Sequence, residues 1–134
     1  MTAGLVGIVL VSHSAQVAES VAELAAGLAA GGPVAPIAAA GGTPDGGLGT
    51  SAERITAAAR EVDRGAGVAL LADLGSAVLT VKALLADEEL PSGARLVDAP
   101  FVEGAVAAVV AASAGAPIDA VALAASEAYT YRKT

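Results

Sequence analysis

The chain has 134 residues, of which 55% are apolar, and this length suits one compact domain of residues 1–134. Its net charge is −7 and no Lys or Arg precedes Arg54, so the clustered cations that nucleic-acid binding requires are missing. With no Cys, one His and no uninterrupted apolar run long enough to cross a bilayer, the sequence argues against disulfides, metal sites and membrane insertion, and we expect a cytoplasmic domain.

The N-terminal third contains the clearest strand and helix patterns. Residues 5–11 are continuously apolar, as in a strand that is buried on both faces. A helix is expected directly after the polar triplet at residues 12–14. Apolar residues at helical spacing predict its buried face: Val17, Val21, Leu24 and Leu28.

The same alternation continues to the C-terminus. A second strand is expected at 34–39, followed by a Gly-rich loop at 38–50. The remaining expected elements are a helix with Ile55, Ala58, Ala59 and Val62 on one face, a strand at 67–72, a helix marked by Val78, Val81 and Leu85, a strand at 94–98, and helices at 101–114 and 118–128.

Strands that alternate with helices predict an α/β fold with an open parallel sheet and helices on both faces. With four strands and right-handed crossovers, we expect the flavodoxin-like order 2-1-3-4. This order places the first and third strands side by side in the centre. Ligands of such sheets bind at the carboxyl ends of the strands, where the strand order reverses.

The only histidine of the chain falls at that edge. His13 follows the first strand and Asp73 follows the third, so their backbones should lie about 5 Å apart. A carboxylate at that distance can accept the proton of one ring nitrogen. The other nitrogen is then left as a free nucleophile, and such a nitrogen beside an anion site fits a phosphohistidine.

Other residues at the same edge could bind the phosphoryl group or a protein partner. His13 stands at the start of a helix, where free N–H groups favour an anion, and glycines at 41–49 allow the backbone to approach one. The candidates for this role are Ser12, Ser14, Gly46, Gly47, Gly49, Thr50, Gly75 and Ser76.

The same residues also have purely structural interpretations. Asp73 or Ser76 could cap the helix that follows the third strand, and Thr50 and Glu53 have the spacing of a capping box. Competing motifs are missing from the sequence: it contains neither a dinucleotide-binding fingerprint after the first strand, nor a P-loop, nor a nucleophile elbow.

The sequence resembles the enzyme IIA domains of the mannose-type phosphotransferase system. Four segments in the family's order carry the resemblance: "GIVLVSHSAQVAESVAELA" (7–25), "GGTPDGGLGTSAERI" (41–55), "LADLGSAVLTVK" (71–82) and "DAPFVEGAVAAVVAASAGAPIDAV" (98–121). Sugar-transporting members typically carry two glycines and Ser-Pro after the third-strand Asp. The "DLGSAV" of this chain instead favours the branch that serves dihydroxyacetone kinase.

The resemblance implies that His13 is the phosphohistidine and that Asp73 supports it. It implies HPr as the phosphoryl donor. Some family members carry a fused HPr-like domain, but this sequence stops at "YTYRKT", so we expect the donor to be a separate protein. The acceptor would be ADP in the kinase subunit (DhaL), without a metal or organic cofactor on this chain, and such domains are usually homodimers. Two alternatives remain: a sugar-specific enzyme IIA that feeds a membrane transporter, and a non-catalytic binding module regulated by phosphorylation.

Overall fold

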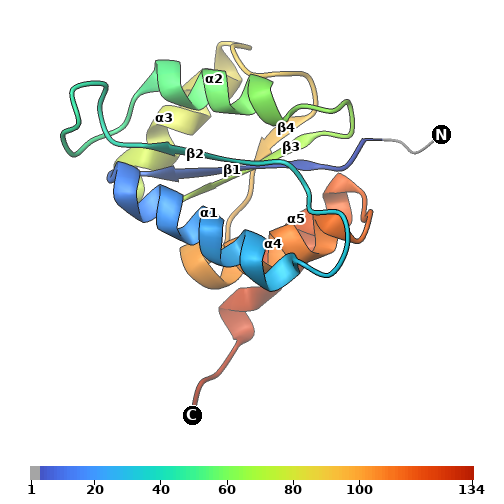
Figure 1. Cartoon of the computed structure of the whole chain (residues 1–134). Helices are drawn as coiled ribbons and strands as arrows, with labels where there is room; N and C mark the ends of the chain where they lie inside the picture. The colour runs from blue at the N-terminus through green and yellow to red at the C-terminus, as the bar shows by residue number, and fades with distance from the viewer. Residues whose placement is uncertain (1–3) are drawn as a thin grey trace.

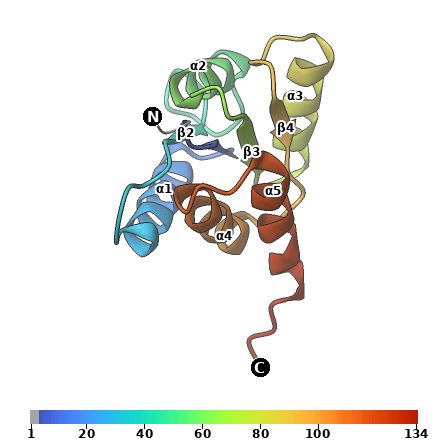
Figure 2. The ribbon, with the colours of Figure 1, turned by 90° about the vertical axis from the view of Figure 1, so that its right-hand side faces the viewer.

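A four-stranded parallel sheet between two layers of helices forms the centre of the protein, in a computed structural model that describes residues 4–134 (Figures 1 and 2). The elements in chain order are β1 (Gly7–Ser12), α1 (Ala15–Ala29), β2 (Ile37–Gly41), α2 (Ala52–Val62), β3 (Val68–Ala72), α3 (Gly75–Ala86), β4 (Ala94–Leu96), α4 (Phe101–Ser113), α5 (Ile118–Glu127) and the short 3-10 helix η1 (Ala128–Thr130).

The sheet has the order β2-β1-β3-β4 and every neighbouring pair is parallel, which confirms the predicted fold. Val11 on β1 pairs with Ala72 on β3, and Ser12 pairs with Gly41 on β2. The three strands therefore end at nearly the same level, and the segments that follow them leave the sheet at one edge.

Alternate residues of β1 face two separate cores. Ile8 and Leu10 face the layer of α1, α4 and α5, whereas Val9 and Val11 face the layer of α2 and α3. Figure 1 shows these layers on opposite sides of the sheet. The continuous apolar run predicted a strand buried on both faces, and all six residues of β1 are buried.

The predicted buried face of α1 is partly wrong. Val21 is buried, but Val17, Leu24 and Leu28 are between 44% and 62% exposed. The helix instead buries Ala18 and Ala25 together with Val21. Small alanine side chains allow the helix backbone to pack closely on its neighbours, so the buried face is rotated from the line of the larger apolar residues.

The remaining predictions differ from the structure mainly at element ends. The second strand begins at Ile37 rather than at residue 34. Pro36 precedes it and has no N–H to donate to a neighbouring strand. The carbonyl of Pro36 nevertheless accepts a hydrogen bond from the N–H of Ile8 at 2.9 Å. The face predicted for α2 is confirmed, because Ile55, Ala58, Ala59 and Val62 are all buried. Within residues 4–134, none of the helices has the length and apolar character needed to cross a membrane.

Candidate functional site

His13 lies between the end of β1 and the start of α1, in a connection of only two residues. On the neighbouring strand, Asp73 directly follows β3, and its N–H donates to the carbonyl of Val11 at 3.0 Å. The sheet itself therefore fixes the separation of the two residues. The expectation that adjacent strands carry them to the same edge is confirmed.

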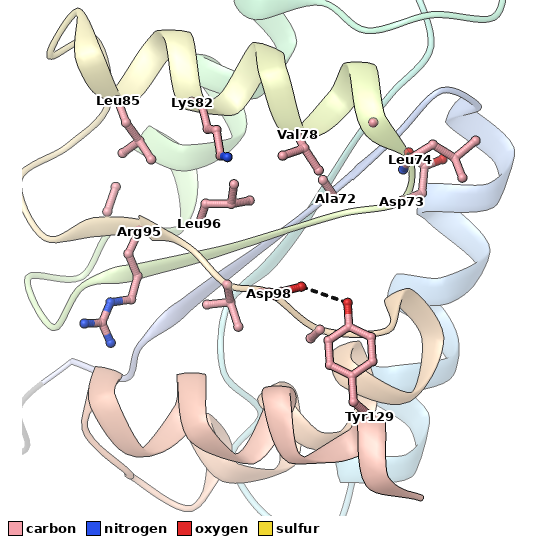
Figure 3. Close-up of a pocket in the computed structure, with 14 residues that line it drawn as sticks. Ala72, Asp73, Leu74, Val78, Lys82, Leu85, Arg95, Leu96, Asp98 and Tyr129 are labelled. Carbon is pink, nitrogen blue, oxygen red and sulfur yellow. Dashed lines mark hydrogen bonds between the residues drawn. The ribbon is translucent and has the colours of Figure 1, made fainter.

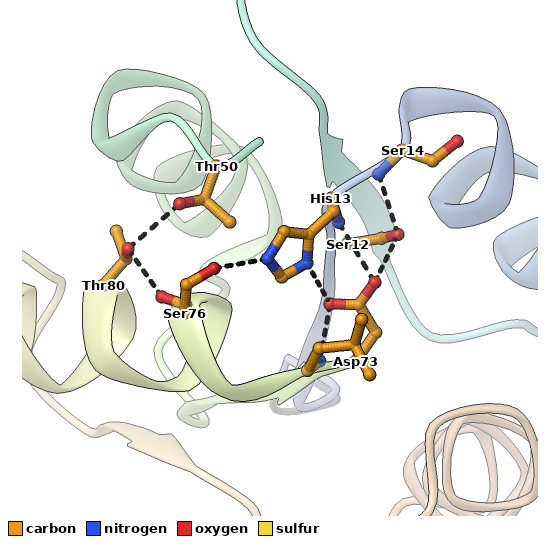
Figure 4. A network of polar contacts seen from close by, with 8 residues as sticks. Ser12, His13, Ser14, Thr50, Asp73, Ser76 and Thr80 are labelled. Atoms are coloured by element: carbon orange, nitrogen blue, oxygen red, sulfur yellow. Dashed lines mark hydrogen bonds and ion pairs between the residues drawn. The ribbon is translucent and has the colours of Figure 1, made fainter. Parts of the chain in front are cut away.

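Asp73 holds the imidazole through an extended set of hydrogen bonds (Figure 4). Its Oδ1 lies 2.9 Å from His13 Nδ1 and accepts the N–H of Leu74 at 2.7 Å. Its Oδ2 accepts the hydroxyl of Ser12 at 2.8 Å and the backbone N–H of His13 at 3.1 Å. Each carboxylate oxygen thus accepts two bonds, and the ring is fixed in orientation with Nδ1 toward the carboxylate.

These contacts keep Asp73 ionised. Burial favours the neutral acid, but hydrogen bonds from the His13 N–H, the Ser12 hydroxyl, the His13 ring and the Leu74 N–H outweigh it and lower the pKa of Asp73 below its ordinary value. A carboxylate that accepts a bond from Nδ1 selects the tautomer with its proton on that nitrogen. The lone pair then resides on Nε2.

Ser76 contacts the other ring nitrogen. Its hydroxyl is hydrogen-bonded to His13 Nε2, from the first turn of α3. The interpretation of Ser76 or Asp73 as the helix cap is wrong, because Leu74 occupies the N-cap position without a side-chain cap bond. The His13 side chain is 26% exposed, so Nε2 can be reached from solvent beside this hydroxyl.

The capping-box interpretation of Thr50 is also wrong. Ser51 caps α2, with its side chain accepting the N–H of Arg54 at 3.2 Å. The hydroxyl of Thr50 is instead bonded to that of Thr80 at 3.1 Å. Because the Thr80 hydroxyl donates to the carbonyl of Ser76 at 2.9 Å, Thr50 is the donor in their pair.

Thr80 was missed by the sequence analysis. A signal for it exists, because Thr80 lies four residues after Ser76 and a helix places such residues on one face. Thr50 and Thr80 connect the start of α2 to the first turns of α3, where Ser76 meets the ring.

The two serines beside His13 have different surroundings. Ser12 is buried, donates to Asp73 and accepts the N–H of Ser14 at 3.1 Å. Ser14 is the N-cap of α1, where its hydroxyl accepts the N–H of Val17 at 3.2 Å.

The Gly-rich loop meets the site at one end. Gly49 N–H donates to the carbonyl of His13 at 2.9 Å. The N–H groups of Gly46 and Gly47 are instead bonded within the loop, to the carbonyl and the hydroxyl of Thr43, both at 3.0 Å. The structure therefore brings Gly49 next to His13, whereas these bonds direct the N–H groups of Gly46 and Gly47 into their own turn.

A groove of about 670 Å³ lies behind the site, along β4 and between α3 and the C-terminal helices (Figure 3). Asp73 lies at one end of it, Tyr129 lies across the groove at that same end, and Lys82 and Arg95 lie farther along. The Tyr129 hydroxyl donates to Asp98 at 2.8 Å, and this bond raises the pKa of Tyr129. His13 is not among the residues that line the groove.

The surroundings of Nε2 determine which groups could lie next to an atom attached to it. Among residues 4–134, no group of three or more His, Cys, Asp or Glu side chains is placed to hold a metal ion. The first turn of α3 faces Nε2 through Ser76, and the N–H groups of Gly75 and Ser76 have no acceptor within the helix. An anion attached to Nε2 would meet these donors and the positive end of the helix dipole.

Known proteins resemble this chain over most of its length. Residues 7–122 match the family described as PTS system fructose IIA component, EIIA-man. A Klebsiella michiganensis protein described as the phosphoryl donor subunit DhaM of PEP-dependent dihydroxyacetone kinase is 38% identical over 120 residues, which cover 87% of this chain. The alignment spans only 25% of that relative, so the chain corresponds to about a quarter of its length.

Two further relatives align along most of their length. The DhaM subunit of dihydroxyacetone kinase 2 from Listeria innocua is 36% identical over 79% of this chain and 85% of its own. A crystal structure of EF1359, described as a protein of unknown function, is 32% identical with a TM-score of 0.75, over 92% of this chain and 94% of its own.

Proposed function

Because the chain belongs to the EIIA-man family of phosphotransferase-system IIA components, we propose that residues 1–134 form one phosphoryl-carrier domain with His13 as the phosphorylated residue. The observation that carries the proposal is the contact of His13 Nδ1 with Asp73 at 2.9 Å, which leaves Nε2 as the nucleophile. The donor is HPr, charged from phosphoenolpyruvate. The acceptor is ADP in the kinase subunit of dihydroxyacetone kinase.

In the first step, the lone pair of Nε2 attacks the phosphorus atom of phospho-HPr. A P–N bond to His13 forms while the bond from phosphorus to the donor breaks, and the electron pair of that bond stays with the donor. Asp73 stabilises the positive charge that develops on the ring. The Ser76 hydroxyl, which lies against Nε2, turns to donate to a phosphoryl oxygen.

In the second step, a terminal phosphate oxygen of ADP attacks the same phosphorus atom. The P–N bond breaks, its electrons return to Nε2, and ATP forms in the partner. Because such transfers depend mainly on alignment and electrostatics, the chain needs no cofactor of its own for them.

Two alternatives share the phosphohistidine: a sugar-specific IIA domain and a module that only changes its binding partners. The proposed assembly is a homodimer. Analytical sedimentation of the purified protein tests this by measuring the mass of the assembly in solution.

The decisive experiment is intact-protein mass spectrometry after incubation with phosphoenolpyruvate, enzyme I and HPr. The wild type is expected to gain one phosphoryl group that is lost in mild acid and retained in base, as a P–N bond is. His13→Ala should remain folded, because the ring lies at the edge of the sheet, and should gain nothing. An acid-stable adduct, or phosphate on His13→Ala, would contradict the assignment.

Delivery is tested by adding ADP and the kinase subunit to the phosphorylated protein. Formation of ATP supports the kinase branch. Transfer to a sugar-transporter component but not to the kinase subunit would support the sugar-specific alternative. Phosphorylation without transfer to either would support the regulatory module.

A further inference from the structure

Among residues 4–134, Ser12 is the one buried residue with a polar side chain, and it is only 1% exposed. Buried polar groups are costly unless they are hydrogen-bonded, so a serine at this position calls for a physical reason. A partner protein that approaches from solvent does not reach this hydroxyl. Whatever Ser12 contributes to the site must therefore pass through the residues that it contacts.

The Ser12 hydroxyl lies between Asp73 and the start of α1 (Figure 4). It accepts the N–H of Ser14 at 3.1 Å and donates to Asp73 Oδ2 at 2.8 Å. Because an ionised carboxylate has no hydrogen to donate, the single hydrogen of the hydroxyl must point to Asp73. A hydrogen bond to an ionised group is stronger than one between neutral groups. Ser12 thus ties the carboxylate to the first turn of α1.

This bond holds the carboxylate from one side of the sheet. Side chains alternate along a strand, so Ser12 lies on the same side of β1 as Leu10, which faces the layer of α1, α4 and α5. The contact of the other ring nitrogen is to Ser76 of α3, in the opposite layer. Asp73 is therefore anchored on the side away from the residue that His13 Nε2 contacts.

Without this hydroxyl, the carboxylate is less constrained. Oδ2 of Asp73 keeps only the backbone N–H of His13, at 3.1 Å, and the N–H of Ser14 loses its acceptor. The terminal torsion of an aspartate side chain has broad energy wells, so the carboxylate can then rotate. Rotation moves Oδ1 away from Nδ1, and that contact selects the tautomer of the ring.

We propose that Ser12 is a positioning residue for phosphoryl transfer, whose buried hydroxyl holds Asp73 in the orientation that aligns His13. This inference rests on the proposed function. Because the donor protein does not reach Ser12, loss of the hydroxyl should slow the transfer step itself and should leave the binding of the donor unchanged.

The kinetic test compares Ser12→Ala with Ser113→Ala, a matched control at the end of α4 that removes a hydroxyl accepting the N–H of Ala35 at 2.8 Å. Single-turnover transfer from phospho-HPr is measured over a range of donor concentrations. At saturating donor, Ser12→Ala should be about tenfold slower than the control, the scale of one hydrogen bond to a charged group. The half-saturating concentration should equal that of the wild type. Ser12→Thr retains the hydroxyl and should recover most of the rate.

The imidazole gives a second readout that does not depend on transfer. His13 is the only histidine, so its two ring nitrogens give the only imidazole nitrogen signals in an NMR spectrum of the chain. At a pH where the ring is neutral, the wild type should show one protonated and one unprotonated nitrogen. In Ser12→Ala the two chemical shifts should move toward each other as the tautomers mix, whereas Ser113→Ala should match the wild type.

The proposal is overturned by a transfer rate of Ser12→Ala equal to that of Ser113→Ala, by a change confined to the half-saturating concentration, or by ring signals that stay those of the wild type. A folded Ser12→Thr as slow as Ser12→Ala would also overturn it. Failure of the wild type to gain a phosphoryl group on His13 would instead contradict the proposed function, and the ring signals would still report whether Ser12 orients the imidazole.

Discussion

At the scale of single residues, the site depends most on Asp73. Its two oxygens accept four hydrogen bonds, from the ring and backbone of His13, from the Ser12 hydroxyl and from the Leu74 N–H. The carboxylate has no hydrogen to donate, so it matches four donors that all point toward it. An Asn side chain has the same shape but cannot accept all four bonds. Its NH2 group is a donor, so two of the four donors would face hydrogens instead of an acceptor.

Asp73→Asn is therefore expected to keep the fold but to impair transfer. Phosphoryl transfer from phospho-HPr should slow by about a hundredfold or more, since the orientation and charge support of the ring are lost. The free energy of unfolding should fall by about 1–3 kcal/mol, because two of the four donors lose their acceptor. Rapid-quench transfer and urea denaturation measure the two effects.

Asp87→Asn, at the exposed end of α3, removes the same charge and serves as the control. Equal transfer rates for the two variants would leave Asp73 with only a structural role.

Part of the residue-level site could be predicted from the sequence. His13 and Asp73 end two strands that the predicted strand order makes neighbours, so their contact follows from topology. The role of Thr50 could not be inferred in this way. Its spacing to Glu53 fits a capping box, but Ser51 is the cap in the structure, and Thr50 reaches Thr80 on another helix. Which of two adjacent hydroxyl residues caps a helix depends on where the chain turns, and that is decided by tertiary packing.

At the scale of elements, the position of His13 depends on where α1 begins. The helix begins at Ala15, directly after its N-cap Ser14 and within three residues of the end of β1. Gly41 at the end of β2 makes room for this start, because a Cβ there would come within 2.4 Å of the Ser14 carbonyl oxygen. A larger residue at position 41 would push the start of α1, and His13 with it, away from the sheet.

The cap of α1 gives the prediction at this scale. Ser14→Ala should lower the free energy of unfolding by about 1 kcal/mol, because the N–H of Val17 loses its acceptor, whereas Ser14→Asn should retain most of it. Urea denaturation measures both, and Ser20→Ala on the exposed face of the same helix is the control. If the Asn variant were as unstable as the Ala variant, capping would not be what Ser14 contributes.

The sheet was predictable because alternating strands and helices with right-handed crossovers leave few possible topologies. The buried face of α1 was not, because the sequence pattern gave weight to Val and Leu while the structure buries alanines there. Hydrophobicity alone does not show how closely a helix packs on its neighbours. That distance decides whether alanine or leucine fits between them.

The Gly-rich loop shows the same limit. Its position after β2 was predicted, but its internal bonds were not, and Gly46 adopts a φ of +88°. Gly46→Val is therefore expected to lower the free energy of unfolding, although no atom crowds that position. A β-branched side chain is strained in that conformation even where the loop is exposed.

At the scale of the whole molecule, the proposed function requires one histidine at one edge of the sheet to serve both the donor and the acceptor. We expect HPr and the ADP-bound kinase subunit to compete, since each must cover the same ring. A saturating excess of unphosphorylated HPr should slow ATP formation from the phosphorylated chain several-fold. An unphosphorylatable HPr variant excludes phosphate return as the cause. Formation of a ternary complex without loss of rate would show that the partners use different faces.

The hydrogen bonds that hold the imidazole are already complete before any partner arrives. An encounter therefore does not have to order a loop or move a strand of this chain, and little binding free energy is consumed by rearrangement. A partner can then react during a brief residence on a weakly held surface and leave quickly afterwards. A relay between two proteins requires this, because a carrier that held its donor tightly would block its own delivery. In the proposed relay, the carboxylate–imidazole pair is thus ready to react on encounter, so transfer does not wait for this chain to rearrange.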